Sequence, residues 1–143
     1  MGFLTRLFGS SKRGSLQDSD FGDFTELNRR GEEIIWKGQV KIFDETISLY
    51  MSGNSSYLDL AEKAKLINVL KNEVVVEAEV NEALREQYED ADKHYSNWRT
   101  HFNCITMSTM GDETSITFEE KNSLHQFNVF LLDCKANGVS IDG

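Results

Sequence analysis

The chain of 143 residues contains no proline, only two cysteines and no long apolar segment. Without proline, every turn has to be built from Gly, Asn, Asp or Ser. Cys104 and Cys134 are too few for a disulfide framework, and the N-terminus lacks an apolar secretory signal, so we expect free thiols and a cytoplasmic location. No apolar run approaches the roughly 20 residues that cross a bilayer, which predicts no transmembrane segment.

Basic side chains are scarce relative to acidic ones. The chain has 24 acidic against 15 basic residues, a formal net charge of −9. Such a charge repels phosphates, so we expect no nucleic acid partner and instead a protein partner that is basic. The acidic residues expected to steer this partner, unless they serve only to keep the protein soluble, are Glu82, Glu86, Glu89, Asp90 and Asp92.

Recognisable catalytic and cofactor motifs are also lacking. There is no glycine-rich phosphate loop, no serine nucleophile elbow and no basic-aromatic patch. The histidines, His94, His101 and His125, are expected at the surface rather than as metal ligands. We therefore predict no cofactor, no metal and no enzymatic activity. The alternative is a small cytoplasmic hydrolase that uses Cys104 with His125.

A long helical middle, from about Ser55 to Trp98, organises the chain. A serine ahead of Asp59 is expected to cap its start, and the weaker pattern at Asn72 predicts two consecutive helices. Residues 74–80 also alternate as a strand would, but the helix formers that follow favour a helix. Apolar residues recur every three or four positions, with charged ones such as Glu62 between them. The face expected to be buried consists of Tyr57, Leu60, Ala61, Ala64, Ile67, Leu70 and Val74.

Strand-like alternation flanks this middle on both sides. The predicted strands cover residues 21–27, 34–42, 47–51, 102–107, 115–119 and 127–132, and a short edge strand is expected near the C-terminus. Runs of strands around helices predict an α+β fold: an antiparallel sheet built from two β-meanders, with a central helical pair packed on one face. Gly38, inside the second strand, indicates a bulge or a close approach. The expected core residues are Trp36, Leu60, Ile67, Leu84, Ile105, Phe118, Val129 and Leu131.

The N-terminus is expected to lie outside the folded domain. We predict a short amphipathic segment over residues 1–9, a flexible linker over 10–19 and a single α+β domain over 20–143. The first segment is interpreted as a docking element for a membrane surface or a partner, or as a piece that packs on its own domain. Its apolar side chains are Phe3, Leu4, Leu7 and Phe8.

Four short segments stand out in the folded part of the sequence. They are Phe21-Gly22-Asp23-Phe24, Ile35-Trp36-Lys37-Gly38-Gln39-Val40, Ile47-Ser48-Leu49 and a His-containing final strand that leads to Ile141-Asp142-Gly143. Together with the helical pair, they resemble families of small bacterial α+β domains without an assigned activity. Some relatives of this kind occur near polymorphic toxin loci. The resemblance therefore implies an immunity-type role, in which the protein binds and blocks a basic partner.

Overall fold

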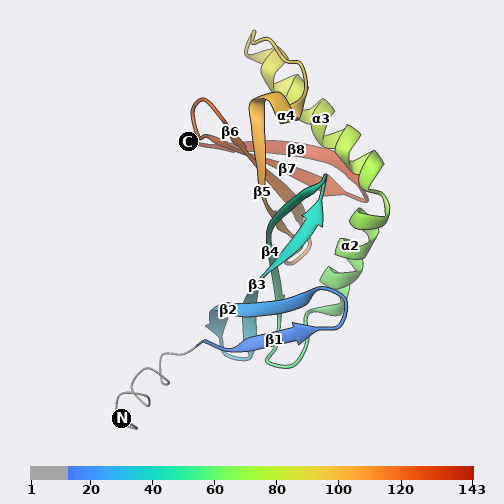
Figure 1. Ribbon diagram of the computed structural model, residues 1–143, viewed down its shortest axis with the longest axis vertical. Helices are drawn as coiled ribbons and strands as arrows, with labels where there is room; N and C mark the ends of the chain where they lie inside the picture. Colours follow the sequence, from blue (N-terminus) through green and yellow to red (C-terminus); the bar gives the residue numbers. More distant parts are fainter. Residues whose placement is uncertain (1–12) are drawn as a thin grey trace.

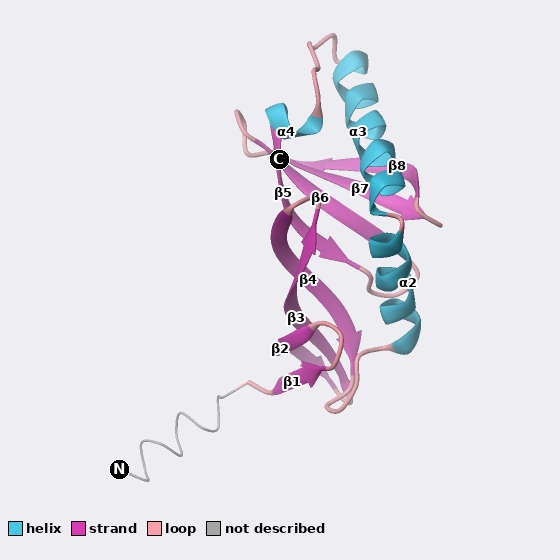
Figure 2. Cartoon of the chain, turned by 45° about the vertical axis from the view of Figure 1, so that its right-hand side comes forward, coloured by secondary structure: helices cyan, strands magenta, loops and turns pink. Residues whose placement is uncertain are grey.

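The computed structural model describes residues 13–143 and has an α+β architecture (Figure 1). Within this range eight strands form one sheet, and helices α2 and α3 run along one side of it in both views (Figures 1 and 2). The predicted α+β class with a mainly antiparallel sheet is confirmed. The strands are β1 (Ser15–Asp18), β2 (Gly22–Arg30), β3 (Glu33–Ile42), β4 (Glu45–Gly53), β5 (Phe102–Ser108), β6 (Thr114–Glu120), β7 (Gln126–Leu132) and β8 (Lys135–Asp142). The helices are α2 (Leu60–Lys71), α3 (Glu73–Asp90) and α4 (Trp98–His101).

The strands follow one another across the sheet in chain order, from β1 to β8. Every neighbouring pair is antiparallel except β4 and β5, which run parallel where Ser48, Leu49 and Tyr50 face Thr106, Met107 and Ser108. Parallel neighbours need a crossover of a dozen or more residues, and the helices between β4 and β5 supply it. The sequence does not predict this parallel pair.

Helix α2 buries a different face from the predicted one. Its N-cap is Asp59 rather than a serine, and Asp59 Oδ1 accepts the N–H of Glu62 at 2.9 Å. Leu60 is 78% exposed, whereas Leu66 and Val69 are buried. The prediction of Leu60 in the core is wrong, because the side of the helix that faces the sheet carries Glu62, Leu66 and Val69.

Glu62 can be buried because both oxygens of its carboxylate accept hydrogen bonds. Oε1 accepts the N–H of Ser52 at 2.8 Å, and Oε2 accepts the N–H of Gly111 at 3.1 Å as well as the Ser52 hydroxyl. Nearby, Lys65 Nζ donates to Gly111 O at 2.6 Å. A buried carboxylate is tolerated when hydrogen bonds replace its water. Helix α2 is thereby joined to the end of β4 and to the β5–β6 turn.

Helix α3 confirms the helical interpretation of residues 74–80, and its junction with α2 at Asn72 is also as predicted. Val76 and Val80, one turn apart, are both buried against the sheet. The helix ends at Asp90, earlier than the predicted limit near Trp98. The chain turns there because Asp92 adopts a left-handed backbone (φ 54°) and Lys93 N–H donates to Tyr88 O at 2.8 Å.

The first described strand lies inside the predicted linker. Ser15 to Asp18 pair with β2, from Ser15 opposite Thr25 to Asp18 opposite Gly22. Lys63 Nζ lies 3.0 Å from Asp18 Oδ1, so this edge is held to α2. The linker prediction fails for these four residues because a polar sequence can still pair at a sheet edge. The segment 1–9, with Phe3, Leu4, Leu7 and Phe8, lies outside the described residues.

The core is a continuous cluster between the sheet and the helices. A Cβ on Gly38 would lie 2.5 Å from the buried Phe24 ring, so the close approach expected at this glycine is present. Strand β7 lies next to the edge strand β8, and Leu132 is 63% exposed. Of the other predicted core residues, the buried ones are Trp36, Leu84, Phe118, Val129 and Leu131, and the half-buried ones are Ile67 and Ile105.

Candidate functional site

The acidic residues expected to contact a partner lie on α3 and in the turn after it, and all are exposed. Together they are called the α3 acidic surface: Glu82, Glu86, Glu89, Asp90 and Asp92. Arg85 lies among them, with its Nη2 2.6 Å from Glu82 Oε1 and its Nη1 in contact with Glu89 Oε2. Both carboxylates raise the pKa of Arg85. Among residues 13–143, the other three acidic residues form no ion pair, so the surface keeps a net negative charge.

An acidic groove of about 200 Å³ runs between α3 and the edge strand β8. Glu79, Glu82 and Glu86 line its helical side, and Ala136 and Val139 line the strand. Glu79 Oε1 accepts the N–H of Ala136 at 2.8 Å, which holds the strand against the helix. The structure therefore brings Glu82 and Glu86 together with Glu79, a residue that the sequence analysis missed. Its spacing of three and seven residues from them was the available signal.

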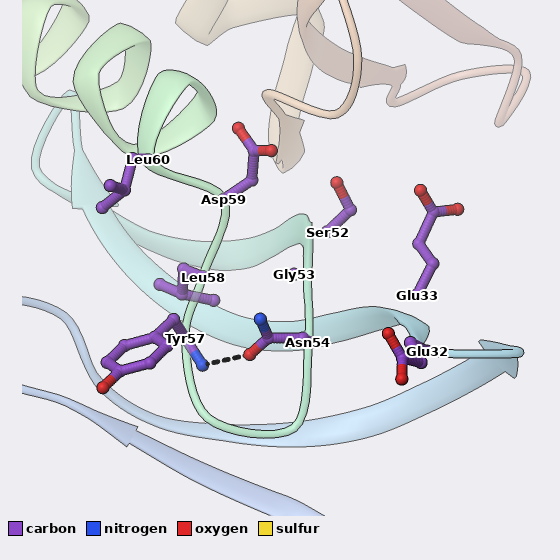
Figure 3. A pocket seen from close by; sticks show the side chains of 9 residues that line it. All are labelled: Glu32, Glu33, Ser52, Gly53, Asn54, Tyr57, Leu58, Asp59 and Leu60. Atoms are coloured by element: carbon purple, nitrogen blue, oxygen red, sulfur yellow. Dashed lines mark hydrogen bonds between the residues drawn. The ribbon is translucent and has the colours of Figure 1, made fainter.

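A larger pocket of about 640 Å³ lies where β4 leads into α2 (Figure 3). We call it the Tyr57 pocket. Figure 3 shows Tyr57, Leu58 and Leu60 on one side and Glu32 and Glu33 on the other. The remaining lining residues are Ser52, Gly53, Asn54 and Asp59. Sequence analysis placed Tyr57 and Leu60 in the core, so it did not anticipate this site.

The loop between β4 and α2 holds Tyr57 outward. Asn54 Oδ1 accepts the N–H groups of Ser56 and Tyr57, each at 2.8 Å, and Trp36 Nε1 donates to Asn54 O at 3.0 Å. A Cβ on Gly53 would collide with Tyr57 O, so only glycine allows this close turn. Tyr57 is 70% exposed as a result.

The Tyr57 pocket combines apolar side chains with carboxylates. Asp59 already caps α2, but Glu32 and Glu33 form no ion pair among residues 13–143. Arg29 lines the adjoining pocket, and its guanidinium is 2.9 Å from Glu26 Oε1, which offsets its charge. A site of this composition suits a ligand that is both apolar and cationic.

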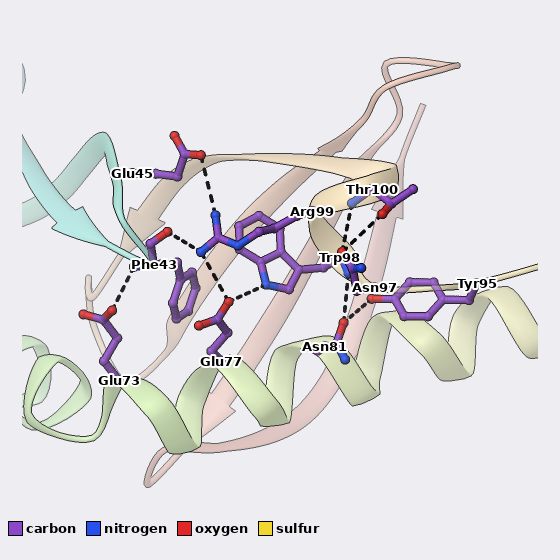
Figure 4. Close-up of polar contacts among 10 residues, drawn as sticks. All are labelled: Phe43, Glu45, Glu73, Glu77, Asn81, Tyr95, Asn97, Trp98, Arg99 and Thr100. Atoms are coloured by element: carbon purple, nitrogen blue, oxygen red, sulfur yellow. Dashed lines mark hydrogen bonds and ion pairs between the residues drawn. The ribbon is translucent and has the colours of Figure 1, made fainter.

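A polar network joins α3, α4 and the β3–β4 turn (Figure 4). Arg99 Nη2 donates to Phe43 O at 2.5 Å and lies 3.4 Å from Glu77 Oε2, while Nη1 lies 3.8 Å from Glu45 Oε1. The guanidinium also lies over the Trp98 ring, 4.5 Å from its centroid. Arg99 is thus occupied in joining three elements, and we assign it a structural role rather than anion binding.

A buried aromatic cluster surrounds Tyr88. Its hydroxyl donates to Glu120, and Ser123 donates to the other oxygen of that carboxylate. Burial raises the pKa of Glu120, but these two hydrogen bonds, together with Lys93 and His125 nearby, outweigh it, so the pKa lies below its usual range. The His101 ring stacks on Tyr95 with centroids 5.1 Å apart, and burial, with His94 nearby, lowers the pKa of His101. The cluster links α3 to β5 and β6.

Acidification should destabilise the protein through His101. The unfolded chain has an ordinary histidine pKa near 6.5, and the folded chain a lower one, so the unfolded chain binds more protons between the two values. The free energy of unfolding should begin to fall as the pH drops through about 6.5, and this loss should be complete below the folded pKa. Urea denaturation from pH 7.5 to 5 measures the slope. His101→Gln should reduce the slope of the free energy of unfolding against pH. An unchanged slope would contradict the assignment of this pH dependence to His101.

The structure does not bring Cys104 and His125 together. Cys104 is in β5 and is 8% exposed, and burial raises the pKa of its thiol to about 12. His125 is exposed, precedes β7 and lies against Gly143; β6 separates its strand from that of Cys104. Cys134 is also buried, with Asn68 Nδ2 donating to its sulfur at 3.4 Å. A buried thiol with a raised pKa is a poor nucleophile.

Residues 13–143 contain no cluster of three or more His, Cys, Asp or Glu side chains able to hold a metal ion. His94 is exposed, and His101 belongs to the aromatic cluster. None of the helices in this range combines the length and the apolar character needed to cross a membrane.

Comparison of the chain with protein-family models, with curated proteins and with solved structures finds no match. The resemblance to small bacterial α+β families therefore stays a prediction.

Proposed function

We propose that this protein is a non-enzymatic interaction domain that binds a basic protein, in the manner of an immunity protein that blocks its target. The observation that carries the proposal is the α3 acidic surface. Glu86, Asp90 and Asp92 are exposed there without an ion pair among residues 13–143, next to a groove that Glu79 and Glu82 also line. A cationic surface of a partner would neutralise the charge of these carboxylates.

The rigidity of α3 supports this assignment. Its opposite face is packed into the core through Val76, Val80 and Leu84, each fully buried. A helix that is held in place before binding loses little conformational entropy when a partner arrives. We further propose that β1–β4 and β5–β8 act as two meanders, with the helical pair packed on one face as the support for this surface.

Capture from the native cell tests the function directly. The tagged full chain should retain a basic protein in stoichiometric amount, more strongly at low salt than at high salt. With the purified partner, Glu86→Gln/Asp90→Asn/Asp92→Asn should slow association by about tenfold at low salt, and by less as the salt rises. The dissociation rate should change less than the association rate.

The matched control removes three charges elsewhere. Asp23→Asn/Asp112→Asn/Glu113→Gln changes exposed acidic residues on other elements, with the same change in net charge. If both triple variants slow association equally, only the net charge matters and α3 is not the contact surface. Recovery of no basic partner at low or physiological salt would contradict the proposed function.

A further inference from the structure

We infer that the Tyr57 pocket is occupied by the N-terminal segment of the same chain, residues 3–8. This goes beyond the proposed function, because it concerns a different surface. The pocket presents Tyr57 and Leu60, which are 70% and 78% exposed, above the buried Leu58. Large apolar side chains exposed side by side in a pocket mark a docking site.

The register of β1 directs the preceding chain toward the pocket. Ser15 lies opposite Thr25, Gly14 O accepts the N–H of Glu26 at 2.9 Å, and Arg13 donates to Leu27 O. Because the two strands are antiparallel, residues that precede Ser15 lie opposite residues that follow Thr25 in β2. In this direction β2 leads to the β2–β3 turn and the start of β3, which supply Glu32 and Glu33 to the pocket.

Gly14, near the start of the described chain, lies close to the loop between β4 and α2 that carries the Tyr57 pocket. A Cβ on Gly14 would lie 3.7 Å from Cη2 of Trp36, and Trp36 Nε1 donates to O of Asn54, a lining residue of the pocket. Between Arg13 and the apolar segment stand only residues 9–12. Four residues span up to about 14 Å when extended, which sets how far the apolar segment can reach beyond Arg13.

The chemistry of the segment complements that of the pocket. Residues 1–12 contain no acidic residue, and they carry Arg6 and Lys12. Glu32 and Glu33 form no ion pair among residues 13–143 and would face these cations. The apolar side chains that would enter are Phe3, Leu4, Leu7 and Phe8. Because the segment is tethered, its effective concentration at the pocket is high even if its intrinsic affinity is low.

Limited proteolysis of the full chain tests the docking. Trypsin cleavage after Arg6, followed by mass spectrometry, should be about tenfold faster in Leu60→Asp than in the wild type, because cleavage requires the segment to leave the pocket. Phe3→Ser/Leu4→Ser/Leu7→Ser/Phe8→Ser should accelerate it similarly. Leu132→Ser, which changes an exposed leucine on β7, is the matched control and should cleave at the wild-type rate.

Amide NMR spectra of the same full-length variants provide a second measurement. The quadruple serine variant should shift the signals of Gly53, Asn54 and Tyr57 while leaving those of β5–β8 in place, which also shows that it is folded. Equal cleavage rates in the wild type and Leu60→Asp, or unshifted pocket signals, would overturn the inference. Protection that increases with protein concentration would also overturn it, since the occupant would then be the segment of a second copy.

Discussion

Replacing Glu62 with alanine is expected to lower the free energy of unfolding by about 2–5 kcal/mol, although the residue is a glutamate on a helix. Its carboxylate accepts the N–H groups of Ser52 and Gly111 at 2.8 and 3.1 Å, and the side chain is buried. Alanine would remove both of these hydrogen bonds to a charged group, each of which contributes about 1.5–3 kcal/mol, and less at Gly111, which is exposed. Urea denaturation monitored by tryptophan fluorescence measures the change.

Two further variants separate hydrogen bonding from helix propensity. Glu62→Gln keeps one acceptor oxygen at nearly the same volume. Its free energy of unfolding should therefore fall between those of the wild type and Glu62→Ala. Glu86→Ala changes an exposed glutamate on α3 and should leave the denaturation midpoint nearly unchanged. If Glu62→Ala unfolds at the wild-type urea concentration, the three hydrogen bonds of this carboxylate do not hold α2 to the sheet.

Replacing each of two leucines on α2 with alanine should lower the free energy of unfolding by very different amounts. Leu66 is fully buried, and Leu66→Ala should cost about 2–5 kcal/mol through lost apolar burial and the cavity that remains. Leu60 is 78% exposed, and Leu60→Ala should change the free energy of unfolding by less than about 0.5 kcal/mol. Thermal and urea denaturation of the two variants give the comparison directly.

This pair also tests which face of α2 is inside. If Leu60→Ala proved the more damaging variant, the face predicted from sequence periodicity would be correct and the packing described above would be wrong. Leu131→Ala, on β7, serves as a reference for core truncation, because Leu131 is buried in agreement with the sequence prediction. Its cost should resemble that of Leu66→Ala.

Much of the secondary structure was predictable because it depends on nearby residues. The helix formers after Val80 extend a helix through residues 74–80 despite their valines, and α3 shows this outcome. Alternation located the main strands, with Trp36 and Val129 buried as expected. The residues of the α3 acidic surface, which the sequence analysis proposed as partner contacts, are exposed. The sequence analysis did not identify Glu79 or the Tyr57 pocket.

The sequence alone determined the α+β class, the junction of two helices at Asn72 and the strand segments, since periodicity and propensity act over a few residues. Only the tertiary structure decided which face of α2 is buried. Both faces of that helix offer apolar side chains, and the choice depends on Ser52 and Gly111, whose N–H groups meet Glu62. Ser52 lies at the end of β4, 10 residues before Glu62, whereas Gly111 lies in the β5–β6 turn, 49 residues after it. Gly111 is brought near Glu62 when β5 pairs with β4, and the same packing leaves Leu60 outside, where it lines the Tyr57 pocket.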